Sequence, residues 1–476
     1  MISIEEFREQ AHQMVDWMAD YYSTIEKFPV KSKVNPGDIL KQIPDNAPEK
    51  GESMAKIFKD FKDFIIPGIT HWQNPKWFAY FQANSSYPSV LAEMLTATLA
   101  TQCMVWETSP AAAELEEKMM VWLKEIMGLP EHFEGVIQDT ASTSTLCAFL
   151  SAREKASGYE INKKGFKGNE NYRIYASTET HSSIDKATRI AGLGDRNLVK
   201  IEVDDKLALK PDILEKTIKE DISSGKNPLC VVATIGTTGT MAIDPLGKIA
   251  EITQKYDIWL HVDAAYAGSA MVLPEYRWMI EGLEHADSYV FNPHKWLFTN
   301  FDLSAYYVKD KDALIRTFSI MPEYLKTQVD QKVNNYRDWG IQLGRRFRAL
   351  KLWFVLRNFG TEELRGRIKK HINMVQELTL EIKNDPDFEL MTENPLNMIC
   401  FRFHPGKIKD ETALNDLNEK ILQNINSTGE TFLTHTRING VYVIRLVAGQ
   451  TYVEKEHLQD VWKLVRTTCF EMYKNE

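Results

Sequence analysis

The chain has 476 residues, of which 43% are hydrophobic and 26% charged, a balance typical of a folded globular protein with two or three domains. The formal net charge is −9 and no basic block is present, which argues against a nucleic acid partner. The five cysteines are widely spaced and form no C-x-x-C motif, which argues against disulfides and against a cysteine zinc site. No metal site is predicted.

The amino-terminal residues give no sign of export. Acidic residues stand where a secretory signal would have basic ones, and no apolar stretch follows them. No run in the chain approaches 18 apolar residues, so we expect no membrane span and a cytoplasmic location. The sequons at Asn84 and Asn426 are therefore interpreted as chance matches.

In chain order, the first predicted elements are helices. Residues 1–85 are expected to form short helices separated by turns, the first over 4–25, and to act as an arm. A helix led by Pro88 follows, and then a helix capped by Ser109 with Pro110 at its first position.

From residue 173 onward the pattern alternates between strand and helix. Strands are predicted at 173–176, 198–203, 229–235, 258–262 and 288–291, and helices at 212–222 and 244–256. This alternation predicts a mostly parallel sheet with helices on both faces. A long helix over about 345–383 precedes strands at 398–403 and 441–446 and helices at 412–425 and 455–472. The resulting division is an arm at 1–85, a large domain at 86–355 and a small α/β domain at 356–476.

Chemically active residues follow several of these strands, at the sheet edge where open α/β proteins bind ligands. Asp263 ends one strand and is followed by Ala-Ala-Tyr-Ala-Gly, while Lys295 lies in Asn-Pro-His-Lys-Trp after another. Taken alone, Asp263 is more simply a capping residue and Lys295 a solvated surface charge. Because both residues follow strands of the same predicted sheet, and because Lys295 has apolar neighbours in the sequence, we interpret them as a functional pair.

Two hydroxyl-rich turns and one histidine extend this group. Thr140-Ala-Ser precedes a helix and offers an anion site at its amino end, and Gly236-Thr-Thr-Gly-Thr follows a strand. His181 follows the 173–176 strand and, taken alone, is more simply a loop histidine. A lysine, a strand-end acid and an anion turn together match what pyridoxal phosphate requires.

The order of these motifs resembles a known family. Thr180-His-Ser-Ser, Gly236-Thr-Thr-Gly-Thr, His261-Val-Asp-Ala-Ala-Tyr-Ala-Gly-Ser and Phe291-Asn-Pro-His-Lys-Trp look like signatures of the aromatic L-amino-acid decarboxylases. This pyridoxal-phosphate-dependent group (the group II decarboxylases) includes the plant tyrosine and tryptophan decarboxylases. The similarity covers almost the whole chain, from Pro67-Gly-Ile-Thr-His-Trp to Leu343-Gly-Arg-Arg-Phe-Arg.

The resemblance implies the aspartate-aminotransferase-like fold (PLP fold type I), with a mostly parallel seven-stranded sheet, and a homodimer with shared active sites. It implies that Lys295 holds the cofactor as an imine, Asp263 pairs with the pyridine nitrogen, His181 stacks on the ring, Ala265 lies under it and Thr238 lies beside Asp263. It also implies that the phosphate is surrounded by Thr140, Ala141, Ser142, Asn292 and His294, with Leu343 and Gly344 reaching in from the partner chain.

The same resemblance indicates the substrate pocket. Trp72, Tyr80 and Phe81 resemble the residues that form its aromatic wall. Ala83 replaces a threonine that reaches a catechol hydroxyl in animal relatives, and Gln102 and Met104 replace the usual Ile and Phe, so a catechol preference is not implied. Gly344 leaves room for an indole where several tyrosine-type plant enzymes carry Ser. Late in the chain, Arg445 is interpreted as part of a structural ion pair and not as a carboxylate clamp.

Two residues decide which product the resemblance predicts. Relatives that use oxygen to form aldehydes tend to replace a mobile-loop tyrosine with Phe or the stacking histidine with Asn, whereas this chain keeps Tyr324 and His181. We therefore predict a carboxy-lyase of amine biosynthesis. Its substrate would be tryptophan, 5-hydroxytryptophan, tyrosine, phenylalanine or dihydroxyphenylalanine, and its products the arylalkylamine and CO2. The alternatives are an aldehyde synthase and a non-catalytic binding protein on the same scaffold. A dinucleotide-dependent enzyme is disfavoured, because it would need a G-x-G-x-x-G turn and none follows the predicted strands.

Overall fold

The computed structural model describes residues 2–320 and 332–475. It consists of two compact units, which we call the terminal unit and the central unit. The terminal unit comprises Met1–Gln82, Glu377–Met391 and Cys400–Glu476, and the central unit comprises Ala83–Gln376 and Thr392–Ile399. The first 82 residues thus group with the end of the chain. The three-part division at residues 85 and 355 stays a prediction.

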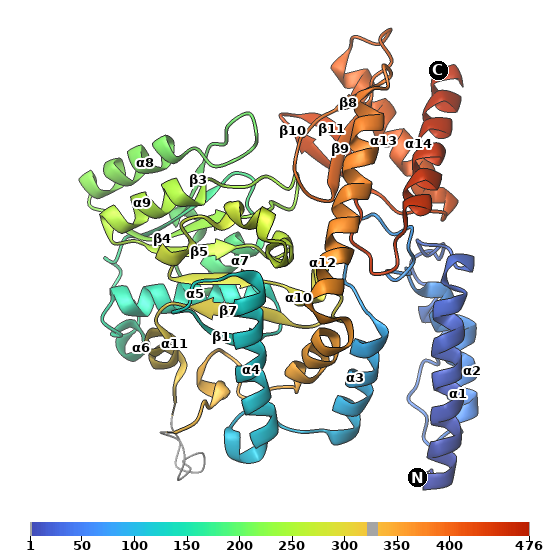
Figure 1. The fold of residues 1–476 in the computed structure, drawn as a ribbon, viewed down its shortest axis with the longest axis horizontal. Coiled ribbons are helices and arrows are strands. Elements are labelled where there is room, and N and C mark those ends of the chain that lie inside the picture. The colour runs from blue at the N-terminus through green and yellow to red at the C-terminus, as the bar shows by residue number, and fades with distance from the viewer. Residues whose placement is uncertain (1, 321–331, 476) are drawn as a thin grey trace. The chain divides into compact units, whose positions relative to one another are not determined.

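The central unit contains the predicted seven-stranded sheet (Figure 1). Its strand order is β1-β7-β6-β5-β4-β2-β3, and β2 to β6 are parallel to their neighbours within that group. The sequence prediction missed β7, which lies antiparallel between β1 and β6. The bounds are β1 Glu134–Gln138, β2 Tyr172–Ser177, β3 Leu198–Ile201, β4 Asn227–Thr234, β5 Trp259–Asp263, β6 Ser288–Phe291 and β7 Ser304–Val308.

Helices cover both faces of this sheet. In Figure 1, α5 and α7 pack against each other, and α8 and α9 lie away from them. The bounds are α3 Tyr87–Leu99, α4 Pro110–Met127, α5 Ala141–Ala156, α6 Ile161–Lys164, α7 Ser183–Ile190, α8 Pro211–Ser223, α9 Leu246–Tyr256, α10 Pro293–Trp296, α11 Lys311–Phe318 and α12 Arg348–Lys383. Gly360, with φ of 68°, interrupts the helical backbone inside α12.

The core of the central unit explains why the strands are continuous apolar runs. Side chains of β2 and β4, such as Ile174 and Val232, pack with Phe149 of α5 and Ile184 of α7. A second cluster joins β1, β6 and β7 to α5 and includes the rings of Tyr306, Tyr336 and Trp339. Because helices cover the strands, their polar residues are confined mainly to the strand ends.

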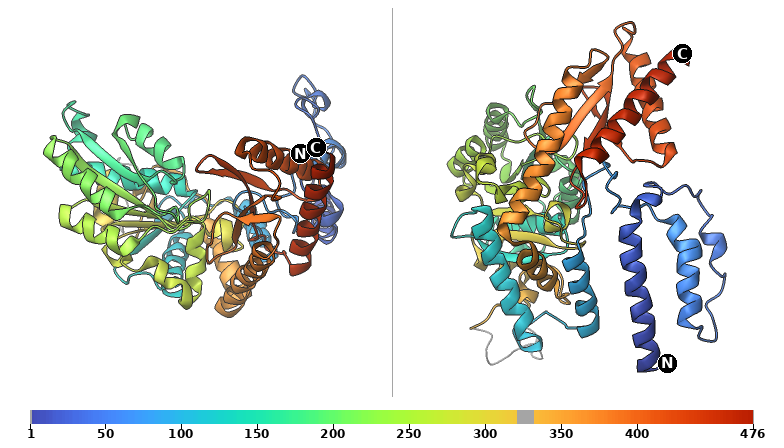
Figure 2. Two further views of the ribbon diagram at one scale, coloured as in Figure 1. Left: turned by 90° about the horizontal axis from the view of Figure 1, so that it is seen from above. Right: turned by 45° about the vertical axis from the view of Figure 1, so that its right-hand side comes forward.

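The terminal unit carries a four-stranded sheet of order β10-β11-β9-β8, which confirms the strands and helices expected after residue 390. Its elements are α1 Ile4–Ser23, α2 Met54–Asp60, β8 Phe388–Leu390, β9 Met398–Phe403, α13 Glu411–Thr428, β10 Thr434–Ile438, β11 Val441–Val447 and α14 Lys455–Asn475. The right-hand view of Figure 2 shows α1 beside α2, where the ring of Trp17 lies 6.0 Å from that of Phe58.

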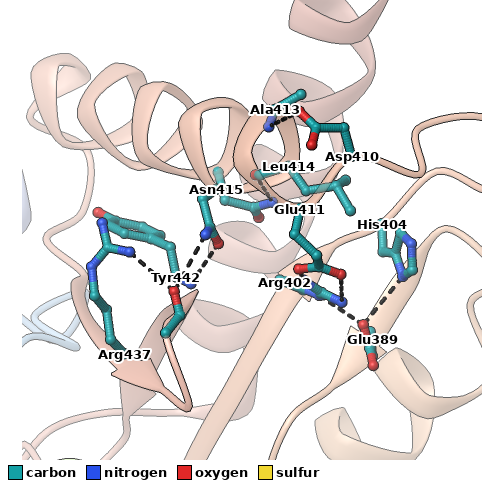
Figure 3. Close-up of polar contacts among 12 residues, drawn as sticks. Glu389, Arg402, His404, Asp410, Glu411, Ala413, Leu414, Asn415, Arg437 and Tyr442 are labelled. Carbon is teal, nitrogen blue, oxygen red and sulfur yellow. Dashed lines mark hydrogen bonds and ion pairs between the residues drawn. The ribbon is translucent and has the colours of Figure 1, made fainter.

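A buried arginine joins three elements of this unit (Figure 3). Arg402 on β9 donates to Glu389 of β8 at 2.7 Å and to Glu411 of α13 at 2.6 Å. His404 Nδ1 lies 3.1 Å from the same Glu389 carboxylate. The start of α13 is capped by Asp410, which accepts a hydrogen bond from the backbone N–H of Ala413.

All five cysteines are buried, and none forms a disulfide. Within residues 2–320 and 332–475, no helix has the length and apolar character needed to cross a membrane.

Candidate active site

Asp263 is the last residue of β5, and its carboxylate is buried at the carboxyl edge of the sheet. It lies opposite Thr234 of β4 and Val290 of β6 in the strand register. The backbone N–H of Ala265 donates to Oδ1 at 3.0 Å. Because an ionised carboxylate has two oxygens and about four lone-pair sites, this single bond leaves capacity to accept a further hydrogen bond from a ligand.

Lys295 lies in the short helix α10 that follows β6, and it is half-buried. Its backbone is held by Asn84, whose side-chain amide donates to the Lys295 carbonyl and whose N–H donates to the His294 carbonyl at 3.0 Å. Next to it, the ring of Trp296 stacks on Tyr266 with centroids 5.0 Å apart. These contacts fix the direction from which the lysine side chain leaves the sheet edge.

Asn84 is a functional contact that the sequence reasoning missed. The sequence showed it only as a sequon, but it is 2% exposed and binds the lysine turn. No local signal identifies this role, because its partner lies 211 residues later in the chain.

His181 lies in the loop between β2 and α7. Its Nδ1 accepts a hydrogen bond from the Ser183 N–H at 3.1 Å, which leaves the proton of the neutral ring on Nε2. Desolvation by the surrounding protein lowers the pKa of His181, the positive charge of Lys295 lowers it further, and Asp263 opposes both. The histidine, the lysine and the aspartate therefore share one electrostatic environment.

The hydroxyl-rich turn after β1 forms the amino end of the 16-residue helix α5. Thr140 is the N-cap, and its hydroxyl accepts from the Thr143 N–H at 3.4 Å. The N–H groups of Ala141 and Ser142 belong to the first helical turn and have no intrahelical acceptor. With the helix dipole, they make a binding site for an anion.

Asn292 and His294 flank this edge from the end of β6. The N–H of Asn292 donates to the Ala265 carbonyl at 2.9 Å, but its buried Oδ1 has no hydrogen-bond partner in the described chain. Such an atom costs about 1–3 kcal/mol unless a ligand pairs with the amide, in either of its two orientations. Burial lowers the pKa of His294 to about 3, and because Nδ1 accepts from the Leu303 N–H, Nε2 carries a proton to donate.

Thr238 lies in the turn after β4, which is shaped by groups that the sequence did not single out. The buried carboxylate of Asp244 accepts from the N–H groups of Thr234 and Leu209 at 2.7 and 2.8 Å, and burial raises its pKa to about 6. Since Asp244 serves this turn, α9 begins at Leu246 and not at the predicted residue 244. Gly236 has φ of 85°, and a Cβ there would lie 2.7 Å from Ala267 Cβ.

Leu343 and Gly344 lie on an exposed loop that is joined to two predicted site segments. Gln102 Oε1 accepts from the Arg345 N–H at 2.7 Å, and a Cβ at Gly344 would lie 3.2 Å from Gln102 Nε2. Gln342 Nε2 donates to Asp139 at 2.7 Å, directly before the anion turn. Met104 is joined to the segment that precedes this loop, because the Met104 carbonyl accepts a hydrogen bond from the Arg337 N–H.

The predicted aromatic wall belongs to the terminal unit. Trp72 stacks on Trp77 at 4.1 Å and on Tyr80 at 6.0 Å, and Phe81 lies under the guanidinium of Arg445 at 5.0 Å. The hydrogen bonds described for Arg445 go to a carbonyl and a hydroxyl and not to a carboxylate. Ala83 is half-buried at the start of the central unit, and Tyr324 lies outside the described residues.

Comparison with known proteins explains this set of groups. Residues 36–404 match the model of the pyridoxal-dependent decarboxylase conserved domain. The chain belongs to this decarboxylase family. It is 42% identical over 472 residues to phenylacetaldehyde synthase of Arabidopsis thaliana (97% of this chain, 95% of that one). It is also 42% identical over 472 residues to tryptophan decarboxylase 2 of Oryza sativa subsp. japonica (97% and 94%).

The fold of this decarboxylase matches that of a solved relative. The crystal structure of Oryza sativa TDC with PLP and tryptamine superposes with a TM-score of 0.96 at 32% identity and covers 99% of both chains. This match confirms the predicted fold class, PLP fold type I.

The residues present fit pyridoxal phosphate. The helix terminus of α5 offers N–H donors to a phosphate, and His294 adds a neutral donor. The Asp263 carboxylate accepts from one backbone N–H and has capacity for a further donor, and the buried amide oxygen of Asn292 has no donor among the described residues. A lysine and a neutral imidazole complete the donor set that this cofactor needs.

Proposed function

We propose that this protein catalyses the pyridoxal-phosphate-dependent decarboxylation of aromatic L-amino acids to arylalkylamines and CO2. The observation that carries the proposal is the buried Asp263 carboxylate at the sheet edge, in the electrostatic environment of Lys295 and His181. The names of the similar proteins, which include tryptophan and tyrosine decarboxylases, support an aromatic substrate.

Each site residue has a proposed task. Lys295 would hold the cofactor covalently and release it to the substrate amine. Asp263, with Thr238 beside it, would keep a proton on the pyridine nitrogen, while Ala265 and His181, as a neutral imidazole, would contact the ring. When bound, the cofactor supplies the aromatic system that accepts the electron pair left behind as CO2 departs. The phosphate is bound by Thr140, Ala141, Ser142, Asn292 and His294, with Leu343 and Gly344 of the second copy.

The remaining residues choose which bond breaks and where the proton goes. Trp72, Tyr80 and Phe81 would bind the substrate ring and so help to orient the Cα–carboxylate bond for cleavage. Ala83, Gln102 and Met104 line the rest of the pocket. Tyr324 donates a proton to Cα after CO2 leaves, and its loop excludes water and oxygen.

We further propose a cytoplasmic homodimer with shared sites. One face of α3 supports this, because Tyr87, Leu91, Leu95 and Leu99 are all exposed and recur every four residues. An apolar stripe of this kind favours burial against another protein surface. The exposed Leu343 and Gly344 are then available to a neighbouring subunit.

A second function has a specific observation in its favour, namely 42% identity with a phenylacetaldehyde synthase. That enzyme class would release an arylacetaldehyde, ammonia and hydrogen peroxide at the expense of oxygen. The presence of both His181 and Tyr324 favours the amine.

One experiment tests the proposal. The purified holoenzyme is incubated with tryptophan, 5-hydroxytryptophan, tyrosine, phenylalanine and dihydroxyphenylalanine, in air and under nitrogen, and amine, aldehyde and peroxide are measured. We expect amine and CO2 in equal amounts under both gases, and no turnover by the Lys295→Ala variant. Mainly aldehyde and peroxide in air would establish the second function. The absence of any product would refute both.

A further inference from the structure

Tyr80 has an unusual backbone conformation in the aromatic wall. Its φ is +51°, in the left-handed region that residues with a Cβ rarely adopt, and its side chain is 50% exposed. The exposed ring still has defined neighbours, because it stacks on Trp72 with an interplanar angle of 18° and meets the edge of Phe432 at 5.9 Å. A strained residue that presents an aromatic ring is a feature expected of a binding surface.

The conformation is held by a buried residue of β11. Arg445 Nη1 donates to the Tyr80 carbonyl at 3.0 Å and to the Thr434 hydroxyl at 3.2 Å. Its guanidinium also lies over the ring of Phe81, the next residue in the chain. Arg445 thus contacts both the strained residue, Tyr80, and its neighbour, Phe81.

The segment around Tyr80 is fastened to the end of β11 on both sides. Val447 donates its N–H to the Phe78 carbonyl at 3.0 Å, and the Gln82 side chain donates to the Val447 carbonyl at 2.7 Å. These two bonds place residues 78 and 82, on either side of Tyr80. The Arg445 bond acts between them, on the carbonyl of Tyr80 itself.

We propose that Arg445 is the positioning residue that holds Tyr80 in its left-handed conformation and thereby orients the ring against which the substrate binds. This inference rests on the proposed function, since it assigns the Trp72 and Tyr80 surface to an aromatic substrate. The guanidinium suits the task because its fork is planar and rigid, so the two N–H groups of Nη1 point in fixed directions toward the Tyr80 carbonyl and the Thr434 hydroxyl. An ammonium group on a flexible stem has no such fixed geometry. Arg445 acts on the ring of the substrate through Tyr80 and does not bind the substrate carboxylate.

The first test separates these two roles by using a ligand without a carboxylate. We expect Arg445→Met to raise KM for tryptophan or tyrosine about 10- to 100-fold, with kcat changed less than about threefold. The Ki of the matching amine product should rise by the same factor, because the amine keeps the ring. A raised KM with an unchanged Ki for the amine would assign Arg445 to the carboxylate and overturn the proposal.

The second test asks whether Arg445 acts through Tyr80. Tyr80→Gly removes the ring and adopts a positive φ without strain, so adding Arg445→Met to this variant should change the amine Ki less than about twofold. Full additivity of the two substitutions would overturn the proposal. Arg445→Lys keeps the charge but not the fork, so it should retain most of the defect; full recovery of KM would also overturn it.

A matched control is Arg402→Met, which removes another buried arginine from the same four-stranded sheet (Figure 3). This variant should lose stability but keep KM and the amine Ki within about twofold of the parent. If it raises both constants as Arg445→Met does, the effect is general loosening of the unit and the proposal fails. Failure of the proposed function is distinguishable, because the unmodified enzyme would then form no amine at all.

Discussion

Replacing Arg345 with methionine should destabilise the central unit strongly. The Arg345 and Glu116 side chains are each 4% exposed, and Nη2 of Arg345 lies 2.5 Å from Glu116 Oε1. The same nitrogen donates to the Ile137 carbonyl at 2.9 Å, and the guanidinium lies 5.2 Å from the ring of Tyr336. Methionine fills a similar volume but leaves the carboxylate of Glu116 buried, with the Ile137 N–H as its one donor among the described residues.

The expected magnitude follows from that unpaired charge. Breaking a buried ion pair by removing one partner costs about 3–5 kcal/mol. For a unit of this size, that corresponds to a fall in Tm of roughly 5–8 °C. Because Arg345 directly follows Leu343 and Gly344, the loop should loosen and the affinity for pyridoxal phosphate should also fall.

Thermal unfolding followed by circular dichroism, with and without added cofactor, measures both effects. Arg346→Met is the matched control, since the Arg346 side chain is 53% exposed and its ion pairs should contribute less than about 1 kcal/mol. The double variant Arg345→Met with Glu116→Gln should recover at least half of the lost Tm, because no buried charge remains. The reasoning is refuted if Arg345→Met melts with the parent protein, or if the double variant is no more stable than the single one.

Three further predictions concern the reaction, the substrate and pH. Tyr324→Phe should lower amine formation on the order of 10²–10⁴-fold and raise aldehyde and peroxide in air; amine formation at the parent rate would exclude Tyr324 as the proton donor. Gly344→Ser places a side chain against Gln102 Nε2, so the ratio of kcat/KM for tryptophan to that for tyrosine should fall about tenfold, and an unchanged ratio would remove Gly344 from the pocket. Burial lowers the pKa of His261 to about 4 and that of His371 to about 3. The unfolded chain therefore binds more protons than the folded chain below about pH 6.5, so the free energy of unfolding should decrease as the pH is lowered. At pH 5 each of the two histidines lowers the free energy of unfolding by an amount on the order of 2 kcal/mol. A His371→Asn variant should therefore show a flatter dependence of Tm on pH. An unchanged slope would contradict the lowered pKa of His371.

Much of the central unit was predictable because its signals are local. Strands covered by helices are continuous apolar runs, so β2, β4, β5 and β6 were recognisable in the sequence. Strand-end groups such as Asp263 and Lys295 stand out because a polar residue after such a run is confined to the sheet edge. The cap at Thr140 is equally local, since it depends on residues three apart.

Some features were decided only by tertiary structure. The sequence prediction missed β7, and only the fold places it antiparallel between β1 and β6. Asp244 is a plausible helix start by its position, yet it serves the backbone of β4 and of residue 209, and this shortens α9.

The contacts that shape the site join residues far apart in the chain. Asn84 holds the Lys295 turn across 211 residues, and Arg445 holds Tyr80 across 365. Residue type and spacing determine which groups can donate, accept or carry charge, and those properties survive in any fold. Which donor meets which acceptor depends on how strands and loops are brought together, because a hydrogen bond needs its two atoms within about 3 Å and no local pattern encodes that distance.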